Sequence, residues 1–314
     1  MKKSIKITLY VVSFIVAFVL SAFVSISITG SLPNKLINVK WNDSIGTTYL
    51  DQEYENKDNH KYDIYIPNGL DKTKNQYLIL YIHGGSFNSG SKNDGATWCK
   101  YYATKGYITA SMDYTLQAKG VEASLYLMQD QIKACVDAIK ERTTKLGYTI
   151  NGMATCGVSA GGTLAMNYAY KNDSSIPVKF VFQLAGPANF EPSKWQILIK
   201  TNKLSGEQEF VKWMTGEDYT EEQMKNKEYQ KMIDGISPDK LVNETSVPTL
   251  IGYGLKDHLV PTDLKFLLID SLKKNSVRYD YIEFPNSNHG MYADLDKLQS
   301  FLDKSIEYCN LYFK

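Results

Sequence analysis

Residues 152–161 read Gly-Met-Ala-Thr-Cys-Gly-Val-Ser-Ala-Gly, a short apolar run that ends in a Gly-x-Ser-x-Gly pentad centred on Ser159. The run predicts a buried strand over 152–158, and the residues after the serine predict a helix over 160–170. A turn this sharp forces Ser159 into a strained conformation, and the two glycines remove side chains that would collide with the neighbouring strand and helix. The Ser159 hydroxyl is therefore expected to stand exposed above the sheet, at the positive end of a helix.

Apolar runs of strand length alternate with helical patterns on both sides of this segment. The predicted strands cover residues 61–67, 76–82, 107–113, 152–158, 178–184, 247–253 and 279–284. The predicted helices cover residues 96–105, 124–146, 160–170, 262–274 and 293–312. Strands that alternate with helices of this length predict an α/β fold, with a mostly parallel central sheet covered by helices on both faces.

One stretch interrupts the alternation, because residues from about 189 to 243 contain amphipathic helical pieces and no convincing strand. An insertion between two strands of such a sheet lies over the carboxyl ends of the strands, where these folds bind ligands. We therefore expect a helical cap over 189–243. Its Trp195, Phe210 and Trp213 are candidates for an apolar acyl pocket, although aromatic residues at helical spacing more often belong to a core.

A glycine-containing loop, His83-Gly84-Gly85-Ser86-Phe87, follows the predicted strand over 76–82. Consecutive glycines let backbone N–H groups approach a ligand closely, and the residue after a nucleophilic serine supplies another donor. Gly84, Gly85 and Ala160 are therefore the candidate donors of an oxyanion hole. His83 ends the wrong strand for a catalytic base, and we expect it to support the loop.

A serine nucleophile needs an imidazole to take its proton and a carboxylate to orient that imidazole. Of the four histidines, His289 lies in a loop just after the last predicted strand, and Asp257 follows the strand before it. The order Ser159, Asp257, His289 is one of the orders that serine hydrolases use. Asp263 is the rival acid, but it falls inside the next predicted helix.

From about residue 60 to the C-terminus the chain resembles an α/β-hydrolase of the esterase/lipase branch related to hormone-sensitive lipase and bacterial carboxylesterases. The motifs that carry the resemblance are the His-Gly-Gly-Ser-Phe loop, Gly90-Ser91-Lys92, the strand end Met112-Asp113-Tyr114, and Gly-Val-Ser-Ala-Gly. The resemblance implies Ser159 as nucleophile, His289 as base and Asp257 as its partner. The chain departs from the family's His-Gly-Gly-Gly loop at Ser86, which leaves the number of oxyanion donors in the loop open.

These features favour hydrolysis of a carboxylic ester through an acyl-enzyme, with no metal and no organic cofactor. The substrate is expected to be a small-molecule or carbohydrate ester, and an acetylated carbohydrate is a candidate. A serine peptidase on the same framework is one alternative, since acyl transfer to amides uses the same three residues. A non-catalytic extracytoplasmic binding domain is the other.

The N-terminus has a different character from the rest of the chain. Lys2, Lys3 and Lys6 precede Ile7–Ile28, a run of 22 residues without a charge. As a helix the run would be about 33 Å long, enough to cross a hydrocarbon core of about 30 Å. We expect a signal anchor over 1–30, with the catalytic domain outside the cell membrane. Secretion after cleavage of a signal peptide is the alternative.

The anchor leaves a linker with an edge strand over 31–58 and a catalytic domain over 59–314. The whole chain carries 35 basic and 34 acidic residues, so no overall positive charge attracts nucleic acid. Its four cysteines lie far apart with no histidine at metal spacing, which argues against a structural zinc site. Their spacing leaves disulfide pairing open, and the sequence does not predict an oligomeric state.

Overall fold

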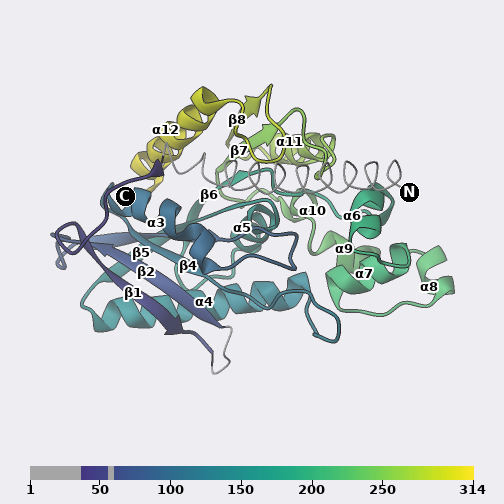
Figure 1. Ribbon diagram of the computed structural model, residues 1–314, viewed down its shortest axis with the longest axis horizontal. Coiled ribbons are helices and arrows are strands. Elements are labelled where there is room, and N and C mark those ends of the chain that lie inside the picture. Colours follow the sequence, from purple (N-terminus) through teal and green to yellow (C-terminus); the bar gives the residue numbers. More distant parts are fainter. Residues whose placement is uncertain (1–36, 56–59) are drawn as a thin grey trace, which may run out of the picture. The chain divides into compact units, whose positions relative to one another are not determined.

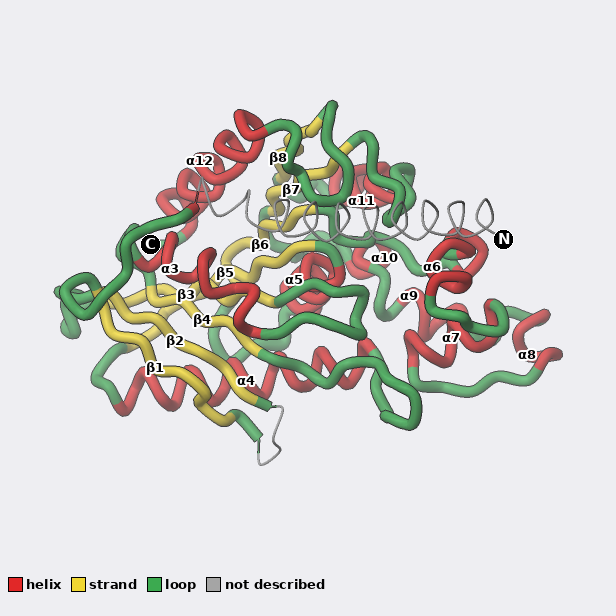
Figure 2. The backbone as a smooth tube through the Cα atoms, in the orientation of Figure 1, coloured by secondary structure: helices red, strands yellow, loops and turns green. Residues whose placement is uncertain are grey.

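The computed structural model describes residues 37–55 and 60–314, and the residues from Val39 onward form one compact unit. At its centre is an eight-stranded sheet in the order β1-β2-β4-β3-β5-β6-β7-β8 (Figures 1 and 2). The strands are β1 (Gly46–Glu53), β2 (Lys61–Pro67), β3 (Asn75–Ile82), β4 (Ile108–Met112), β5 (Thr149–Val158), β6 (Val178–Leu184), β7 (Thr249–Gly254) and β8 (Tyr279–Phe284).

The sheet is mostly parallel, as predicted. β1 pairs with β2 and β2 with β4 in antiparallel fashion, whereas every pairing from β4 through β3 to β8 is parallel. The central strands β4, β6 and β7 are almost entirely buried. Burial on both faces is typical of strands in a parallel sheet, and here it extends to polar side chains of these strands such as Thr109, Ser111 and Gln183.

Helices cover the sheet on both sides. Tyr102 on α3 shares a hydrogen bond of 2.7 Å with Ser305 on α12, so these two helices lie on one face. On the other face α5 packs against α4 and α10 (Pro238–Leu241), and α10 packs against α11. The helices outside the insertion between β6 and β7 are η1 (Lys92–Gly95), α3 (Ala96–Ala103), α4 (Leu125–Lys145), α5 (Ala160–Lys171), α11 (Leu264–Lys274) and α12 (Leu295–Tyr312).

Helix α4 shows how the sequence specifies one of these elements. Ser124 caps its N-terminus, with its hydroxyl oxygen accepting a hydrogen bond of 3.1 Å from the Leu127 N–H. Met128, Ile132 and Cys135 recur at helical spacing and are fully buried. Burying each such side chain contributes roughly 1.5–3 kcal/mol, so the apolar stripe rather than helix propensity holds α4 in place.

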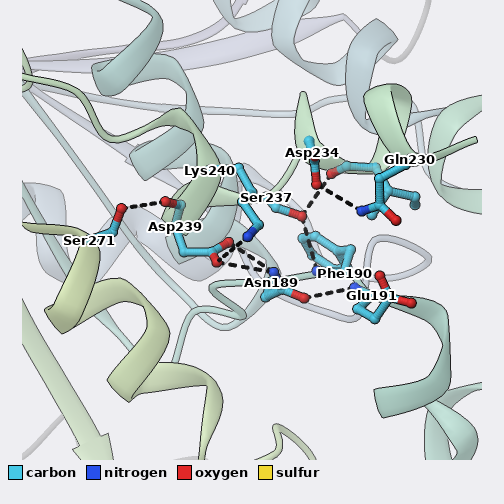
Figure 3. A network of polar contacts seen from close by, with 10 residues as sticks. Asn189, Phe190, Glu191, Gln230, Asp234, Ser237, Asp239, Lys240 and Ser271 are labelled. Atoms are coloured by element: carbon cyan, nitrogen blue, oxygen red, sulfur yellow. Dashed lines mark hydrogen bonds and ion pairs between the residues drawn. The ribbon is translucent and has the colours of Figure 1, made fainter.

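The insertion between β6 and β7 contains only helices, as expected. They are η2 (Pro192–Lys194), α6 (Gln196–Thr201), α7 (Glu207–Thr215), α8 (Glu221–Lys225), α9 (Gln230–Asp234) and α10 (Pro238–Leu241). The Asn189 amide near the start of the insertion donates to both carboxylate oxygens of Asp239 near its end, at 3.0 and 3.1 Å (Figure 3). This contact joins the start of the insertion to α10, its last helix.

The aromatic residues of the insertion divide into two groups. Trp195 and Phe210 are 2% and 0% exposed, and the Trp195 ring stacks with both Phe190 and Phe210, so these residues form the insertion's own core. Trp213 is only half-buried and lines a groove. An acyl-pocket role is therefore unsuited to the first two and stays a prediction for the third.

Two further expectations concern residues outside the site. The signal anchor over 1–30 lies outside the described residues, and within 37–55 and 60–314 no helix has the length and apolar character needed to span a bilayer. Cys99, Cys135, Cys156 and Cys309 are all free thiols and all buried. The sheet is therefore held by packing without disulfide bonds among these four cysteines.

Candidate active site

The loops that carry the candidate residues all leave one edge of the sheet. The strand register pairs Ile82 at the end of β3 with Gly157 in β5, and Gly254 at the end of β7 with Phe284 at the end of β8. Because β3, β5, β7 and β8 run parallel, the residues after their last positions emerge on the same side. The structure thus gathers His83, Ser159, Asp257 and His289 along the carboxyl edge.

Ser159 occupies the turn between β5 and α5 in a conformation that few residues adopt, with φ 57° and ψ −127°. Its N–H donates to the Leu184 carbonyl at 2.8 Å, and its carbonyl accepts from the Thr163 N–H at 3.2 Å. A side chain at Gly157 would meet the Gly161 backbone at 2.5 Å, and one at Gly161 would meet the Ile82 carbonyl oxygen. The pentad's glycines are therefore required by close packing around the serine.

The loop after β3 lies against this turn. A Cβ added to Gly84 would fall 2.6 Å from the Val158 carbonyl oxygen and 3.4 Å from the Ser159 Cβ. Within the described residues, the N–H groups of Gly84, Gly85 and Ala160 have no hydrogen-bond partner. Backbone donors with no partner, close to a strained serine, are suited to bind an oxyanion.

Three successive residues of this loop are left-handed, with φ values of 110° at Gly85, 52° at Ser86 and 65° at Phe87. Ser86 thus follows a path that glycine would favour, in place of the third glycine of the related motif. Phe87 tolerates its strain because its ring is 1% exposed and packs against Phe190 at 6.0 Å between ring centres.

His83 lies beneath the loop and is fully buried. Its Nδ1 contacts the Gly84 carbonyl oxygen at 2.7 Å, and its ring stacks on Tyr114 with 4.1 Å between ring centres. Burial lowers the pKa of His83, although the Gly84 hydrogen bond and the charges of Asp113 and Asp94 oppose this effect. A neutral ring in this position can brace the loop, and the supporting role of His83 stays a prediction.

Asp257 and His289 are in direct contact. The His289 Nδ1 lies 2.8 Å from the Asp257 Oδ2, and the other carboxylate oxygen accepts from the N–H groups of Leu259 and Val260 at 2.8 and 3.1 Å. Burial alone would raise the pKa of Asp257, but the His289 hydrogen bond and charge and the two backbone donors hold it below its ordinary value. Asp257 is thus an ionised, buried partner for the imidazole.

The rival acid and the serine stand differently towards His289. The Asp263 carboxylate is exposed and pairs with the Lys194 ammonium at 2.6 Å, and among the described residues it forms no hydrogen bond or ion pair with His289. Ser159 forms no hydrogen bond with His289 in the described residues. Catalytic hydrogen bonds are often long before substrate binds and shorten in the complex, so the lack of a Ser159–His289 hydrogen bond is compatible with proton transfer between these residues.

Tyr114 is a residue whose contribution the sequence did not reveal. Besides stacking on His83, its hydroxyl donates to the His83 carbonyl at 2.9 Å. The strand end Met112-Asp113-Tyr114 belongs to the motifs of the family resemblance, and that is the signal that marks this tyrosine. Tyr114 therefore holds the ring and the carbonyl group of His83 at the base of the loop.

A groove of about 1200 Å³ lies beside the same loop, between residues 117–127 and helix α7. Asn88 lies at its border, and the Asn88 amide donates to the Asn202 side-chain oxygen at 2.8 Å across the start of the insertion. Trp213 forms part of the opposite wall, while Ser159 and His289 are not among the lining residues. The groove therefore adjoins the candidate oxyanion loop rather than the serine itself.

The described residues contain no group of His, Cys, Asp and Glu side chains arranged to hold a metal ion.

Comparison with known proteins places this geometry in a family context. A family model described as BD-FAE matches residues 62–272, about two thirds of the chain. Esterase B from Lactobacillus rhamnosis superimposes with a TM-score of 0.69 at 16% identity, covering 94% of this chain and 96% of its own. A truncated carbohydrate esterase from gut microbiota superimposes with a TM-score of 0.66 at 17% identity, covering 87% and 99%. These likenesses confirm the predicted α/β-hydrolase fold.

The curated relatives are more distant. Kynurenine formamidase of Danio rerio is 26% identical over 153 residues, which cover 48% of this chain and 49% of the relative. Dipeptidyl-peptidase 5 of Aspergillus oryzae is 24% identical over 258 residues, which cover 78% of this chain and 33% of the relative. The chain thus spans about half the length of the first relative and a third of the second.

Proposed function

Since the chain belongs to the BD-FAE family and has the fold of the α/β-hydrolases, we propose that it is a serine hydrolase that cleaves carboxylic esters through an acyl-enzyme. The observation that carries the proposal is the backbone of Ser159, held at φ 57° and ψ −127° between a strand and a helix. Such strain persists only where the surroundings impose it, and it presents the hydroxyl above the sheet.

The first half of the proposed reaction forms the acyl-enzyme. His289 takes the Ser159 hydroxyl proton on Nε2 as the serine oxygen attacks the ester carbonyl carbon, while Asp257 stabilises the resulting imidazolium through Nδ1. The N–H groups of Gly84, Gly85 and Ala160 bind the oxyanion of the tetrahedral intermediate. The carbon–oxygen bond to the alcohol then breaks, and the alcohol leaves with the proton from His289.

The second half releases the acid. His289 removes a proton from a water molecule, which attacks the acyl carbon, and the same backbone donors bind the second oxyanion. Collapse breaks the bond to the serine oxygen, which regains a proton from His289. Each residue ends in its starting state, so the cycle balances without an oxidant or reductant.

We further propose that the groove beside Asn88 receives the bulkier part of the substrate. It adjoins the oxyanion loop, and the half-buried Trp213 offers an aromatic surface on its wall. If so, Trp213→Ala raises the KM for a long-chain or carbohydrate ester and leaves the KM for an acetate ester within about twofold. An equal change for both esters would place the bulky group elsewhere.

Hydrolysis of an amide is the second candidate function. The similarity to a kynurenine formamidase and to a dipeptidyl-peptidase favours it, because both names describe cleavage of a carbon–nitrogen bond. The same serine, imidazole and oxyanion donors would act on such a substrate. Ester and amide hydrolysis therefore differ here only in the leaving group.

A direct comparison of substrates tests the proposal. The full-length chain, purified in a mild detergent, is assayed with p-nitrophenyl acetate, an acetylated oligosaccharide, an aryl formamide and aminoacyl nitroanilides. We expect turnover of an ester that Ser159→Ala abolishes. Faster turnover of the formamide or the anilides would favour the second candidate, and turnover that survives in Ser159→Ala would reject a serine mechanism.

A further inference from the structure

One carboxylate joins the two ends of the loop that carries His289. We call these ends, Asn286-Ser287 and Asp294, the neck of the loop. Asp294, which is 4% exposed, follows the loop and turns its side chain back across it. Its Oδ2 accepts hydrogen bonds from the Asn286 N–H at 2.9 Å and the Ser287 hydroxyl at 2.7 Å, and its Oδ1 accepts from the Asn286 amide at 2.9 Å. Three hydrogen bonds thus join the two ends of a loop whose middle is His289.

The Asp294 side chain does not cap the helix that follows it, although it occupies the N-cap position. It is the residue before the first turn of α12, where an aspartate ordinarily accepts a hydrogen bond from the helix's first N–H groups. Here the carboxylate makes no such bond with α12. Both oxygens serve the loop instead, which indicates that loop closure is the main role of this side chain.

The closed neck is in turn tied to the loop of the catalytic acid. Ser287 is fully buried, and its hydroxyl oxygen accepts from the Ala293 N–H at 3.1 Å. The Ser287 carbonyl accepts from the N–H of Lys256, the residue before Asp257, at 3.0 Å. A continuous series of contacts therefore runs from Asp294 through Ser287 to the backbone beside Asp257.

We propose that Asp294 is a positioning residue, which holds the His289 ring in register with Asp257 by clamping the neck of the loop over 286–294. The inference rests on the proposed function, because it assigns a role within that reaction. A displacement of a catalytic group by about 1 Å can reduce a rate by about a hundredfold, so a clamp that touches no reacting atom still matters for the rate.

The charge of Asp294 is part of the clamp. Burial would raise the pKa of its carboxyl group, but the hydrogen bonds from Ser287 and Asn286 keep the pKa below its ordinary value. An asparagine at this position has only one acceptor atom and places an NH2 group against one of the donors. Asp294→Asn therefore removes the charge and breaks one of the three bonds, or reverses its direction where the Asn286 amide flips, without changing the volume of the side chain.

The test compares Asp294→Asn with two controls. Asp296→Asn removes the same charge from an exposed position two residues further along α12. Tyr102→Phe removes a buried hydrogen bond that holds α12 to α3, and so weakens the same helix away from the loop. All variants are measured with p-nitrophenyl acetate well below their melting temperatures.

For Asp294→Asn we expect kcat to fall by about 10- to 100-fold with KM within about twofold of wild type, because the chemical step depends on the imidazole. Ser287→Ala, which removes one of the three bonds, should lower kcat by a smaller factor and serves if Asp294→Asn fails to fold. Both controls should keep kcat. A loss of kcat in Tyr102→Phe equal to that in Asp294→Asn would mean that destabilising α12 is the whole effect and would overturn the proposal.

A spectroscopic readout keeps this result separate from the proposed function. The His289 Nδ1 proton, shared with Asp257, is expected to give a low-field resonance in the proton NMR spectrum of wild type. The clamp predicts that the resonance broadens or disappears in Asp294→Asn and persists in Tyr102→Phe, whether or not any ester is turned over. An unchanged resonance in Asp294→Asn would show that the loop does not need the clamp.

Discussion

Replacing Asp257 with asparagine is expected to reverse the proton arrangement on His289. One Asp257 oxygen accepts from the N–H groups of Leu259 and Val260, at 2.8 and 3.1 Å, and an amide oxygen would keep that position because an NH2 group there would face two donors. The NH2 group of the asparagine would then point at the His289 Nδ1 and donate to it. Nδ1 becomes the acceptor, Nε2 carries the proton, and the ring can no longer accept a proton from Ser159.

The backbone donors thus determine the size of the effect, because they prevent the amide from flipping to a harmless orientation. We expect kcat for p-nitrophenyl acetate to fall by about 10⁴-fold, the scale on which serine proteases respond to this change. The corresponding loss of transition-state stabilisation is about 5.4 kcal/mol, at 1.36 kcal/mol for each factor of ten. KM should change little, since no ground-state contact with the substrate is removed.

The assay needs a matched control and a check of the fold. Asp263→Asn removes a nearby carboxylate, which pairs with Lys194 rather than with His289. This variant should retain the wild-type kcat. Circular dichroism melting should show that Asp257→Asn is folded at the assay temperature. The reasoning is refuted if Asp257→Asn keeps more than a tenth of the wild-type kcat, or if Asp263→Asn loses as much.

Three further predictions concern packing and burial. A side chain at Gly254 would meet the carbonyl oxygens of Ser287 and Asn288 at 2.5 Å, so Gly254→Ala should displace the His289 loop and lower kcat at least tenfold, whereas Gly206→Ala, at a position with open space, should not. Burial lowers the pKa of His83, so the unfolded chain binds a proton at this histidine more readily than the folded chain does. The free energy of unfolding therefore carries no penalty from His83 above the ordinary histidine pKa of about 6.5. Below that pH it declines by at most about 1.4 kcal/mol per pH unit. Urea unfolding at about pH 7.5 and 5.5 should therefore show a smaller difference in His83→Asn than in wild type, and an equal difference would contradict the assignment. Lys92→Met should lower the free energy of unfolding by roughly 3–5 kcal/mol, because it leaves the buried Asp63 carboxylate without its ion-pair partner at 2.8 Å. Lys133→Met, which breaks an exposed ion pair, should lower it by under about 1 kcal/mol. Similar losses in both variants would argue against a buried-charge effect.

The elements were predictable from local patterns because each apolar run is bounded by polar or turn-forming residues. The predicted strands over 61–67, 178–184 and 279–284 match β2, β6 and β8 at both ends. Helix starts were less certain: the helix predicted from residue 262 begins at Leu264, since Asp263 occupies the position before its first turn. The order of the strands, with β4 between β2 and β3, follows from pairing across the whole sheet and has no local signal.

The candidate site was predictable where a residue stands at a strand end in a recognisable order. This applied to Asp257 and His289, whose contact the structure shows, and to Ser159 at its strand–helix turn. Tyr114 was marked only by the strand-end motif of the family resemblance, and nothing in the sequence marked Asp294, because a single polar residue in or beside a loop leaves no periodic pattern. Their contributions become visible only when the backbone brings His83 and Ser287 within hydrogen-bonding distance of them.

The central claim is that Ser159 is an activated nucleophile, and intact-mass measurement after treatment with a fluorophosphonate tests it most directly. We predict one adduct per full-length chain, located by peptide mapping on the segment that contains Ser159, and no adduct in Ser159→Ala. Absence of labelling in the folded wild-type chain, or an adduct that persists in Ser159→Ala, would contradict the claim.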